Sequence, residues 1–417
     1  MREVLTERRE AVQVDGALGD WQAITIKFSG EVLPRERAEA FKGAMFAAYP
    51  GDLVFSKIDA RNGAVGLIPD SIAKAVVTSE YPVFTPKADK LRAAYLNHLL
   101  RAEHFKADLQ SKASGTSGRK RVTPEGFLSL EVPVPALDEQ DALVAAYTAA
   151  LSRAAQLEQE ADAIERSGWQ AFETALGVAP PPPLPDRPVF VARFKDVERW
   201  SHDGILRGAL GNGATSSETP MEPLGNALLE VRHGCSKGPS KKTTSLRVLK
   251  ISAVTKGRID LEEHKFISDE PALREQFALK AGDILMCRTN GTLAYVGMSA
   301  LVEANINDMI FPDKIIRVRP NLDRIEPRFL WRLLQVPAVR SQIEAAARTA
   351  VGNFAIGGKD IKALKVPLPL RAQQEALAQA LGDAVTDAAV KRTAAATLRQ
   401  SAWATFEAAL FTPAASS

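Results

Sequence analysis

One long helix-forming run occurs twice in this chain, and it constrains the fold more than any other feature. From Asp138 to Leu176, apolar or small residues recur in steps that alternate between four and three, which is the spacing of a coiled-coil seam. The seam positions are Leu143, Tyr147, Ala150, Ala154, Leu157, Ala161, Ile164, Gly168 and Ala171. Such a run predicts a helix about 54 Å long if it is unbroken.

The second copy lies 234 residues further along, so that Leu143 corresponds to Leu377. The match includes identities that a heptad pattern does not require, namely Ser167, Trp169, Phe172, Glu173, Ala175 and Leu176, which recur as Ser401, Trp403, Phe406, Glu407, Ala409 and Leu410. A single seam would indicate an ordinary amphipathic helix, but two matching copies predict two long helices packed on each other. Because Lys391 replaces Leu157 in the seam, we expect a partner to cover part of this surface.

The duplication extends to the segments before each helix. Ala281-Gly282-Asp283 mirrors Pro50-Gly51-Asp52, and the helix expected from Phe329 to Ala346 copies one expected from Ala93 to Gln110. The offset between the copies drifts from 231 to 234, which predicts an insertion of three residues. Alternating apolar runs predict short strands at Ala23–Phe28, Leu53–Phe55, Ala64–Ile68, Val76–Val77 and Pro82–Phe84.

The predicted organisation is therefore two mixed α/β (α+β) domains, each followed by a long helix. We place the first domain at 1–135, its helix at 136–178, a proline-rich linker at 179–193, the second domain at 194–369, its helix at 370–411 and a tail at 412–417. Pro180–Pro183 makes the linker stiff.

Composition describes an ordinary globular protein, with 46% hydrophobic and 25% charged residues and a net charge of +3. No apolar run approaches the length of a membrane span, and Met1-Arg2-Glu3 begins no signal peptide. Cys235 and Cys287 lack metal-ligand spacing. We therefore expect a cytoplasmic protein with reduced thiols and no contact with a membrane.

The chain lacks the motifs of an enzyme. It contains no Asn-Pro-Pro-Tyr or Asp-Pro-Pro-Tyr run of a methyltransferase and no Walker lysine motif. Glu263 and Lys265, with Asp260 nearby, have the spacing of one nuclease class, but such short spacings are common by chance. The five histidines form no pair at metal-ligand spacing. We expect no catalytic residue and no metal ligand in this chain.

Charge placement is the strongest functional signal. The stretch from Arg232 to Arg258 contains eight basic residues and no acid. A solvated basic face is the alternative explanation, but the Gly/Ser character of the loop favours phosphate contacts. The candidates for DNA binding in this stretch are Arg232, Lys237, Lys241 and Lys242.

Two further groups of donors lie in loops. One is a Gly/Ser loop with basic residues, and the other is a short loop that follows a strand; arginine can bind guanine with two hydrogen bonds, and glycine lets backbone approach phosphate. The candidates are Ser56, Lys57, Arg61, Asn62, Lys112, Ser117, Arg119, Lys120 and Arg121 in the first copy, and Arg288, Thr289, Asn290, Arg348 and Asn353 in the second. Exposed polar turns are the alternative explanation for each group.

With these features in place, the chain resembles the specificity (S) subunit of type I restriction–modification systems. The resemblance covers nearly the whole chain. It is carried by Pro50–Lys57, by Ser114–Arg119, by Val132-Pro133-Val134-Pro135 with Glu139-Gln140, and by their second copies, in the same order.

The resemblance implies a non-catalytic subunit in phage defence with two target recognition domains, each reading half of a bipartite site on double-stranded DNA. The long helices would form an antiparallel coiled coil that separates the domains and docks two methyltransferase subunits. S-adenosylmethionine would belong to those partners, and ATP with Mg to the restriction/translocase subunits, so this chain would bind no cofactor. Because Thr349–Asn353 lacks the arginine cluster of the first copy, the site should be asymmetric.

The expected helix length sets an upper limit on the separation of the two DNA half-sites. Helices of about 54 Å and DNA with about 3.4 Å per base pair allow half-site centres at most roughly 16 base pairs apart. Two other functions remain open at this point: a DNA-binding adaptor of another phage-defence system, and a coiled-coil scaffold that does not bind DNA.

Overall fold

A computed structural model describes residues 1–13, 18–35, 44–113, 121–178, 220–350 and 352–411, together with positions 189, 191 and 205. The chain divides into two compact units. Unit 1 is Met1–Gln159 with Lys391–Ser417, and unit 2 is Glu160–Val390. Most of the expected linker at 179–193 and all of the expected tail at 412–417 lie outside the described residues.

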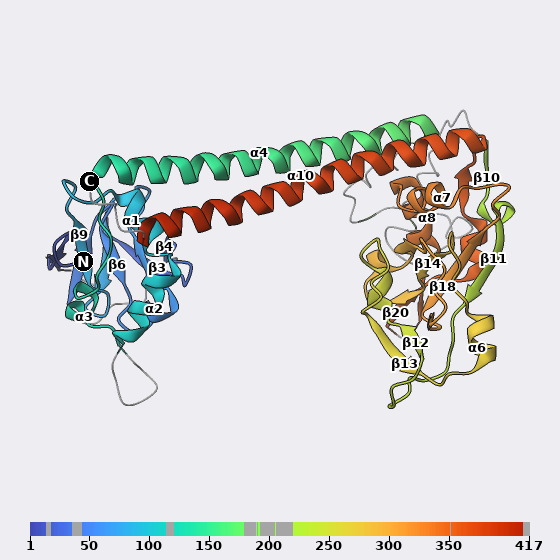
Figure 1. Ribbon diagram of the computed structural model, residues 1–417, viewed down its shortest axis with the longest axis horizontal. Coiled ribbons are helices and arrows are strands. Elements are labelled where there is room, and N and C mark those ends of the chain that lie inside the picture. The colour runs from blue at the N-terminus through green and yellow to red at the C-terminus, as the bar shows by residue number, and fades with distance from the viewer. Residues whose placement is uncertain are drawn as a thin grey trace. The chain divides into compact units, whose positions relative to one another are not determined.

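The described residues of unit 1 form two sheets (Figure 1). The first is antiparallel, in the order β1 (Leu5–Arg8), β9 (Val83–Pro86), β6 (Leu53–Phe55) and β7 (Val65–Leu67). The second has the order β2 (Ala11–Val12), β5 (Met45–Ala48), β8 (Ala75–Thr78), β3 (Gln22–Ile26) and β4 (Val32–Pro34), with β3 and β8 parallel. The five strands expected from alternation are thereby confirmed to within two residues at each end.

Aromatic residues fill the core of unit 1. The ring of Phe55 on β6 stacks at 4.5 Å on Phe127 and at 6.1 Å on Phe84 of β9. Three short helices cover this cluster: α1 (Ala93–Leu99), α2 (Glu103–Ser111) and α3 (Pro124–Leu128). Burying large apolar side chains such as these is the main favourable contribution to folding.

Unit 2 repeats the first sheet strand for strand. Its order is β11 (Leu228–His233), β18 (Ile315–Pro320), β14 (Ile284–Cys287) and β16 (Ser299–Leu301). A second sheet, β13 (His264–Ile267), β12 (Leu246–Leu249) and β17 (Met309–Ile310), matches β4, β3 and β8, including the parallel pair. The duplication seen in the sequence therefore extends to the order and the direction of the strands.

Helices and small strands complete unit 2. The helices α6 (Pro271–Gln276), α7 (Pro327–Leu333), α8 (Pro337–Ala346) and α9 (Gly358–Ala363) surround its core. One pair of strands is β10 (Met221–Pro223) with β21 (Lys365–Pro367). A three-stranded sheet has the order β15 (Thr289–Asn290), β20 (Asn353–Ala355) and β19 (Arg348–Ala350).

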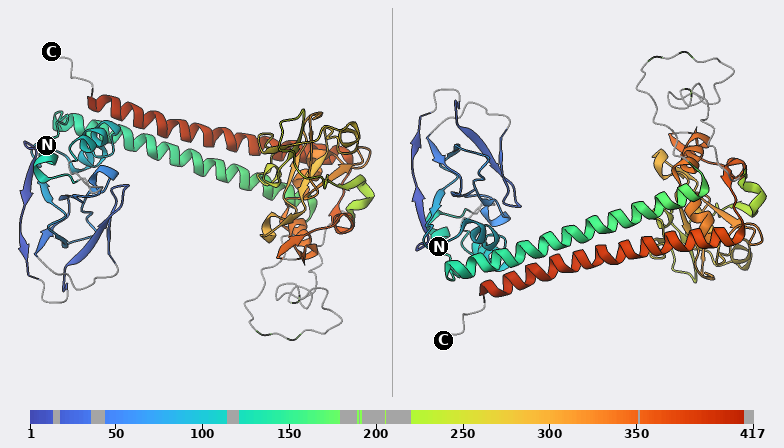
Figure 2. Two further views of the ribbon diagram at one scale, coloured as in Figure 1. Left: turned by 90° about the horizontal axis from the view of Figure 1, so that it is seen from below. Right: turned by 90° about the horizontal axis from the view of Figure 1, so that it is seen from above.

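The two long helices are α4 (Leu137–Leu176) and α10 (Arg371–Phe411). Within each unit a stretch of α4 lies beside a stretch of α10 that runs in the opposite direction (Figures 1 and 2). In unit 1, Tyr147 packs against Trp403 and Phe406, and Glu158 forms an ion pair with Arg399. The expected pair of long antiparallel helices is confirmed. No helix in the described residues is long and apolar enough to cross a membrane.

A buried glutamine fixes the start of each long helix. Gln140 is fully buried, donates to the carbonyl oxygens of Lys90 at 2.9 Å and Pro135 at 2.8 Å, and accepts from the Arg92 N–H at 2.9 Å. In unit 2, Gln374 makes the same three bonds with the residues 234 positions later, Arg324, Pro369 and Glu326. This glutamine, which is Gln140 in the first copy and Gln374 in the second, thus ties each helix to its own domain.

Two expected helices, Ala93–Gln110 and Phe329–Ala346, are wrong as single helices, because each is broken in two. The run from Ala93 to Gln110 forms two helices, α1 and α2, because the chain leaves the helical conformation at Ala102, whose ψ is 139°. Ala102 is fully buried. The same break in unit 2 separates α7 from α8, where Pro337 occupies the first turn of α8 and favours a helix start.

Candidate nucleic-acid interface

In unit 1 the candidate loops meet at the backbone of Lys57. The N–H of Lys57 donates to the carbonyl of Glu80 at 3.0 Å, and its carbonyl accepts from the N–H of Val122 at 2.8 Å. The side chain of Arg121, one residue before Val122, pairs with the Glu80 carboxylate at 3.3 Å. We call this set of backbone bonds the junction. It joins the loop after β6, the turn before β9 and the end of the Gly/Ser loop.

Unit 2 contains the same junction with different side chains. The N–H of Arg288 donates to the carbonyl of Lys314 at 2.9 Å, and its carbonyl accepts from the N–H of Ile356 at 3.1 Å. Lys314 replaces Glu80 and Ala355 replaces Arg121 at the corresponding positions. The same arrangement of backbone hydrogen bonds therefore carries different charged side chains in unit 1 and in unit 2.

A small sheet brings most unit 2 loop candidates together. β15, which contains Thr289 and Asn290, pairs with β20, and β20 pairs with β19, where Thr289 lies opposite Ala355 and Arg348 is on the outer strand. Asn353 is exposed at the turn of this hairpin, and Arg348 is exposed and pairs with Asp360 at 3.4 Å. The three-residue insertion lies beside this sheet, between Arg288 and β16. The two units thus differ most where the candidates gather.

Two arginines at these positions carry unused donors. Arg61 lies in the short 3-10 helix Ala60–Asn62, and Arg288 follows β14. The Nε atom of each is buried and has no hydrogen-bond partner among the described residues. The Nη1 atom of Arg288 donates to the carbonyl of Asp313 at 3.0 Å. Buried donors without partners are rare in proteins, so these two Nε atoms are exceptions to the usual pairing of buried polar groups.

Several predicted side chains instead stabilise local turns. The hydroxyl of Ser56 is buried and accepts from the N–H of Asp59 at 3.2 Å. The amide of Asn62 donates to the Asp59 carboxylate at 3.4 Å, and the amide oxygen of Asn290 accepts from the N–H of Thr292 at 2.9 Å. Lys112 is exposed at the end of α2, two residues after Gln110, which donates to the carbonyl of Arg61 at 3.4 Å. Ser117, Arg119 and Lys120 lie outside the described residues.

Half of the basic side chains in the stretch from Arg232 to Arg258 already form salt bridges within the protein. Acids from other parts of unit 2 pair with half of its eight basic residues: Arg232 with Glu230, Lys237 with Glu270, Arg247 with Asp308 and Lys250 with Glu263. Four exposed residues form no salt bridge with any described residue: Lys241, Lys242, Lys256 and Arg258. Glu263, considered above for its nuclease spacing, accepts from Lys250 and Ser252.

The loop of Lys237, Lys241 and Lys242 belongs to another part of unit 2. Ser240 in this loop donates its N–H to the carbonyl of Phe266 on β13 at 2.8 Å, and Lys237 reaches Glu270 beside α6 at 2.6 Å. Within the described part of the chain, no hydrogen bond or ion pair joins these lysines to the β15–β20–β19 sheet. Unit 2 therefore presents two separate basic regions.

The charge of the partly buried Glu230 on β11 is compensated by arginines. Burial raises the pKa of Glu230, but hydrogen bonds from Arg317 and Arg232 outweigh burial and hold this pKa below its usual range. Burial, and then the charge of Arg288, lower the pKa of His233. Arg232 thus forms an ion pair with Glu230 on the same strand.

Two charged residues at the junction are absent from the sequence-based candidates, Glu80 and Lys314. Lys314 is exposed, and its carbonyl anchors Arg288. The offset of 234 that relates Glu80 to Lys314 was available in the sequence, but neither residue stands in a basic or glycine-rich loop. Their position next to Lys57 and Arg288 follows only from strand pairing.

The Gly-Asp motifs before these loops are structural. Asp52 is buried and accepts from Arg8 at 2.8 Å and from Thr85 at 2.7 Å. Asp283 is buried and accepts from Arg319, which stands at the position of Thr85, at 2.6 Å. The arginine partner has thus moved from β1 in unit 1 to β18 in unit 2 while the buried carboxylate is retained.

The sequence of this chain is similar to that of known proteins of one kind. The specificity subunit of the type I restriction enzyme EcoKI from Escherichia coli strain K12 is 23% identical over 287 residues, which are 66% of this chain and 55% of that subunit. The chain is similar to type I restriction specificity subunits. It spans about half the length of that relative. No protein-family model matches the chain.

Solved structures show the same fold. The HsdS subunit from Thermoanaerobacter tengcongensis superposes with a TM-score of 0.53 at 14% identity, covering 98% of this chain and 95% of that one. A chain from a structural study of complex assembly and conformational transition in a type I R-M system superposes with a TM-score of 0.59 at 16% identity, with the same coverage. Two α/β units with two long helices are therefore the specificity-subunit fold.

Proposed function

We propose that this chain is the DNA-binding specificity subunit of a type I restriction–modification complex, and that each unit reads one half of a bipartite, asymmetric DNA site. The observation that carries the proposal is the shared junction. Lys57 and Arg288 occupy the same backbone position, while the neighbouring side chains differ in charge. Two domains that share a backbone arrangement but differ in surface side chains are suited to bind two different DNA sequences.

The proposed DNA contacts fall into two classes. Arg61, Arg121, Arg288 and Lys314 would face the bases or their edges, since arginine offers paired donors to guanine. Lys241 and Lys242, on the separate basic loop, would contact phosphates and position the unit without reading sequence.

The helices would dock two methyltransferase subunits. An apolar groove of about 560 Å³ between α4 and α10 in unit 2 supports this, because its lining includes Ile164, Phe172, Leu377 and Leu381. Exposed Val390 lies on the same helix as the last two. We propose that those partners bind S-adenosylmethionine and that a restriction subunit uses ATP and Mg, so that this chain contributes recognition and no catalytic group.

DNA affinity tests the proposal at the basic loop. We expect the chain, assembled with its methyltransferase subunits, to bind a duplex with an affinity that falls steeply with salt, because phosphate contacts release counterions. Replacing Lys241 or Lys242 by Ala should lower the salt slope by about one for each phosphate that the variant no longer binds. Lys237→Ala is the matched control in the same loop, because Lys237 is already paired with Glu270.

Affinity that is weak and independent of salt would contradict the proposal and favour the scaffold function. Equal effects of the three lysine substitutions would contradict the assignment of Lys241 and Lys242 as phosphate-binding residues.

A further inference from the structure

In unit 1 the guanidinium of Arg121 and the carboxylate of Glu80 lie end to end. The Nη1 atom of Arg121 donates to Oε1 of Glu80 at 3.4 Å, and its Nη2 atom lies 3.3 Å from Oε2. The two side chains are 50% and 40% exposed. An exposed ion pair stabilises a fold only weakly, so a ligand can compete for the arginine at little cost.

The fold does not require the carboxylate of Glu80. The junction uses only the carbonyl oxygen of this residue, and in unit 2 the carbonyl of Lys314 takes the same role with a side chain of opposite charge. Ala355 stands at the position of Arg121, so unit 2 has neither member of the pair. The acid and the arginine therefore occur together in one unit and are both replaced in the other, while the backbone arrangement is retained.

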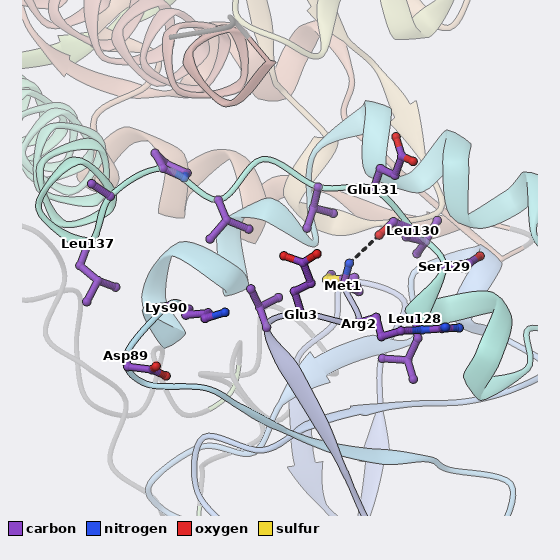
Figure 3. A pocket seen from close by; sticks show the side chains of 15 residues that line it. Met1, Arg2, Glu3, Asp89, Lys90, Leu128, Ser129, Leu130, Glu131 and Leu137 are labelled. Atoms are coloured by element: carbon purple, nitrogen blue, oxygen red, sulfur yellow. Dashed lines mark hydrogen bonds between the residues drawn. The ribbon is translucent and has the colours of Figure 1, made fainter. Parts of the chain in front are cut away.

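The backbone that follows Arg121 is anchored. Val122 is buried, and its N–H donates to the junction at 2.8 Å. The hydroxyl of Thr123 caps the N-terminus of α3. The carbonyl of Leu128, the last residue of α3, accepts from the N–H of Arg2 at 3.1 Å, and Figure 3 shows these two residues next to each other. The anchored segment fixes the place from which the Arg121 side chain extends.

A guanidinium beside a carboxylate matches the major-groove edge of one guanine–cytosine pair. Guanine presents N7 and O6 as acceptors, which arginine binds with two hydrogen bonds, and cytosine presents its N4 amino group, which a carboxylate accepts. In an adenine–thymine pair an amino donor faces the arginine and the thymine O4 acceptor faces the carboxylate. Because a carboxylate also repels the phosphates of DNA, it lowers affinity unless it has a donor such as the cytosine amino group.

We propose that Arg121 and Glu80 together select one guanine–cytosine pair in the half-site of unit 1. Arg121 binds the guanine, while Glu80 orients the guanidinium and accepts a hydrogen bond from the cytosine amino group. The inference rests on the proposed function, since it requires unit 1 to bind DNA in the major groove. Because Lys314 and Ala355 replace the pair in unit 2, this selection belongs to one half-site only.

Base selectivity of the assembled complex tests the proposal. Mapping of methylated adenines gives the motif, and exchange of residues 1–135 identifies the half that unit 1 reads, which must contain a guanine–cytosine pair. Replacing that pair by adenine–thymine should weaken binding by the unaltered complex about tenfold or more. Glu80→Ala and Arg121→Ala should each reduce this discrimination at the same base pair and leave it unchanged at the other positions.

A modified base and a matched control separate base recognition from a structural effect. A duplex with 7-deazaguanine at this pair lacks the N7 acceptor and should bind the unaltered complex about tenfold more weakly, but should not weaken binding by Arg121→Ala. Glu31→Ala is the control, because it removes another exposed acid of unit 1, paired with Lys27 at 3.0 Å, and should preserve base selectivity.

Two results would overturn the inference while leaving the proposed function intact. One is a half-site of unit 1 without a guanine–cytosine pair. The other is a Glu80→Ala complex that keeps its selectivity at every base pair, or that loses affinity equally for all sequences. An unaltered complex that selects no split site would instead contradict the proposed function itself.

Discussion

At the scale of single residues, the repeated polar side chains of this protein fall into two kinds. Gln140 and Gln374 are buried and make equivalent bonds in the two units, and Asp52 and Asp283 are buried and each accepts from an arginine. Lys57 and Arg288 share a backbone position but not a side chain. The first kind maintains the frame, because a buried polar group that loses its partners is costly. The second kind is free to vary.

Removing a frame residue should destabilise its own unit. We expect Gln140→Ala to lower the free energy of unfolding of unit 1 by about 3 kcal/mol, because it leaves the carbonyls of Lys90 and Pro135 and the N–H of Arg92 without partners. Hydrogen exchange resolved by unit would measure this. Gln156→Ala, at an exposed position on the same helix, should change stability by less than about 0.5 kcal/mol.

The carboxylate of Asp269 should respond to pH in a defined window. Hydrogen bonds from Arg274 and then Ser245 lower the pKa of Asp269 to about 2. Because the folded pKa lies below the ordinary value, its stabilising contribution is complete above the ordinary pKa and is lost as pH falls through the folded pKa. A carboxyl titration followed by NMR should show this low pKa, and Arg274→Gln should raise it. An ordinary pKa in the unaltered protein would contradict the assignment.

At the scale of elements, close packing of the long helices depends on small residues. Buried Ala154 and Ala161 on α4, with Ala388 and Ala395 on α10, occupy seam positions. A Cβ atom at Gly168 would lie 2.8 Å from the Cβ of Ala384. The sequence seam therefore predicted which face is buried, and small residues there permit the helices to approach closely.

The seam can be tested at its tightest point. Gly168→Val should destabilise unit 2 by about 2 kcal/mol through overpacking against Ala384. Gly382→Ala is the matched control, because a Cβ atom at Gly382 would have no neighbouring atom within 4 Å and a helix gains about 1 kcal/mol from this change. Thermal unfolding should shift in opposite directions, and shifts in the same direction would contradict this account of the packing.

Elements formed by long-range pairing were beyond the reach of the sequence. The break at Ala102 has no proline or glycine nearby, although Pro337 in the second copy marks it. The hairpin of β19 and β20 was expected only as a loop, because its pairing with Thr289 and Asn290 joins distant segments. The acids that neutralise Arg247 and Lys237 are likewise distant in sequence. Periodicity predicts helices and strands well, but it does not predict which charges meet.

At the scale of the whole chain, duplication was the feature that the sequence expressed most clearly. The strand orders β1-β9-β6-β7 and β11-β18-β14-β16 are the same, and each unit uses parts of both long helices. The repeated seam together with the repeated Trp-x-x-Phe-Glu ending revealed it. The half-site read by each unit depends on loop side chains, so the recognised bases follow from neither composition nor fold.

The most direct test of the proposed function is to co-express this chain with a cognate type I methyltransferase subunit and to map methylated adenines in the host DNA. We expect methylation at one split, asymmetric motif that disappears without this chain. Exchanging residues 1–135 for those of another specificity subunit should change only one half of the motif. Methylation that persists without this chain, or an exchange that alters both halves, would contradict the proposal.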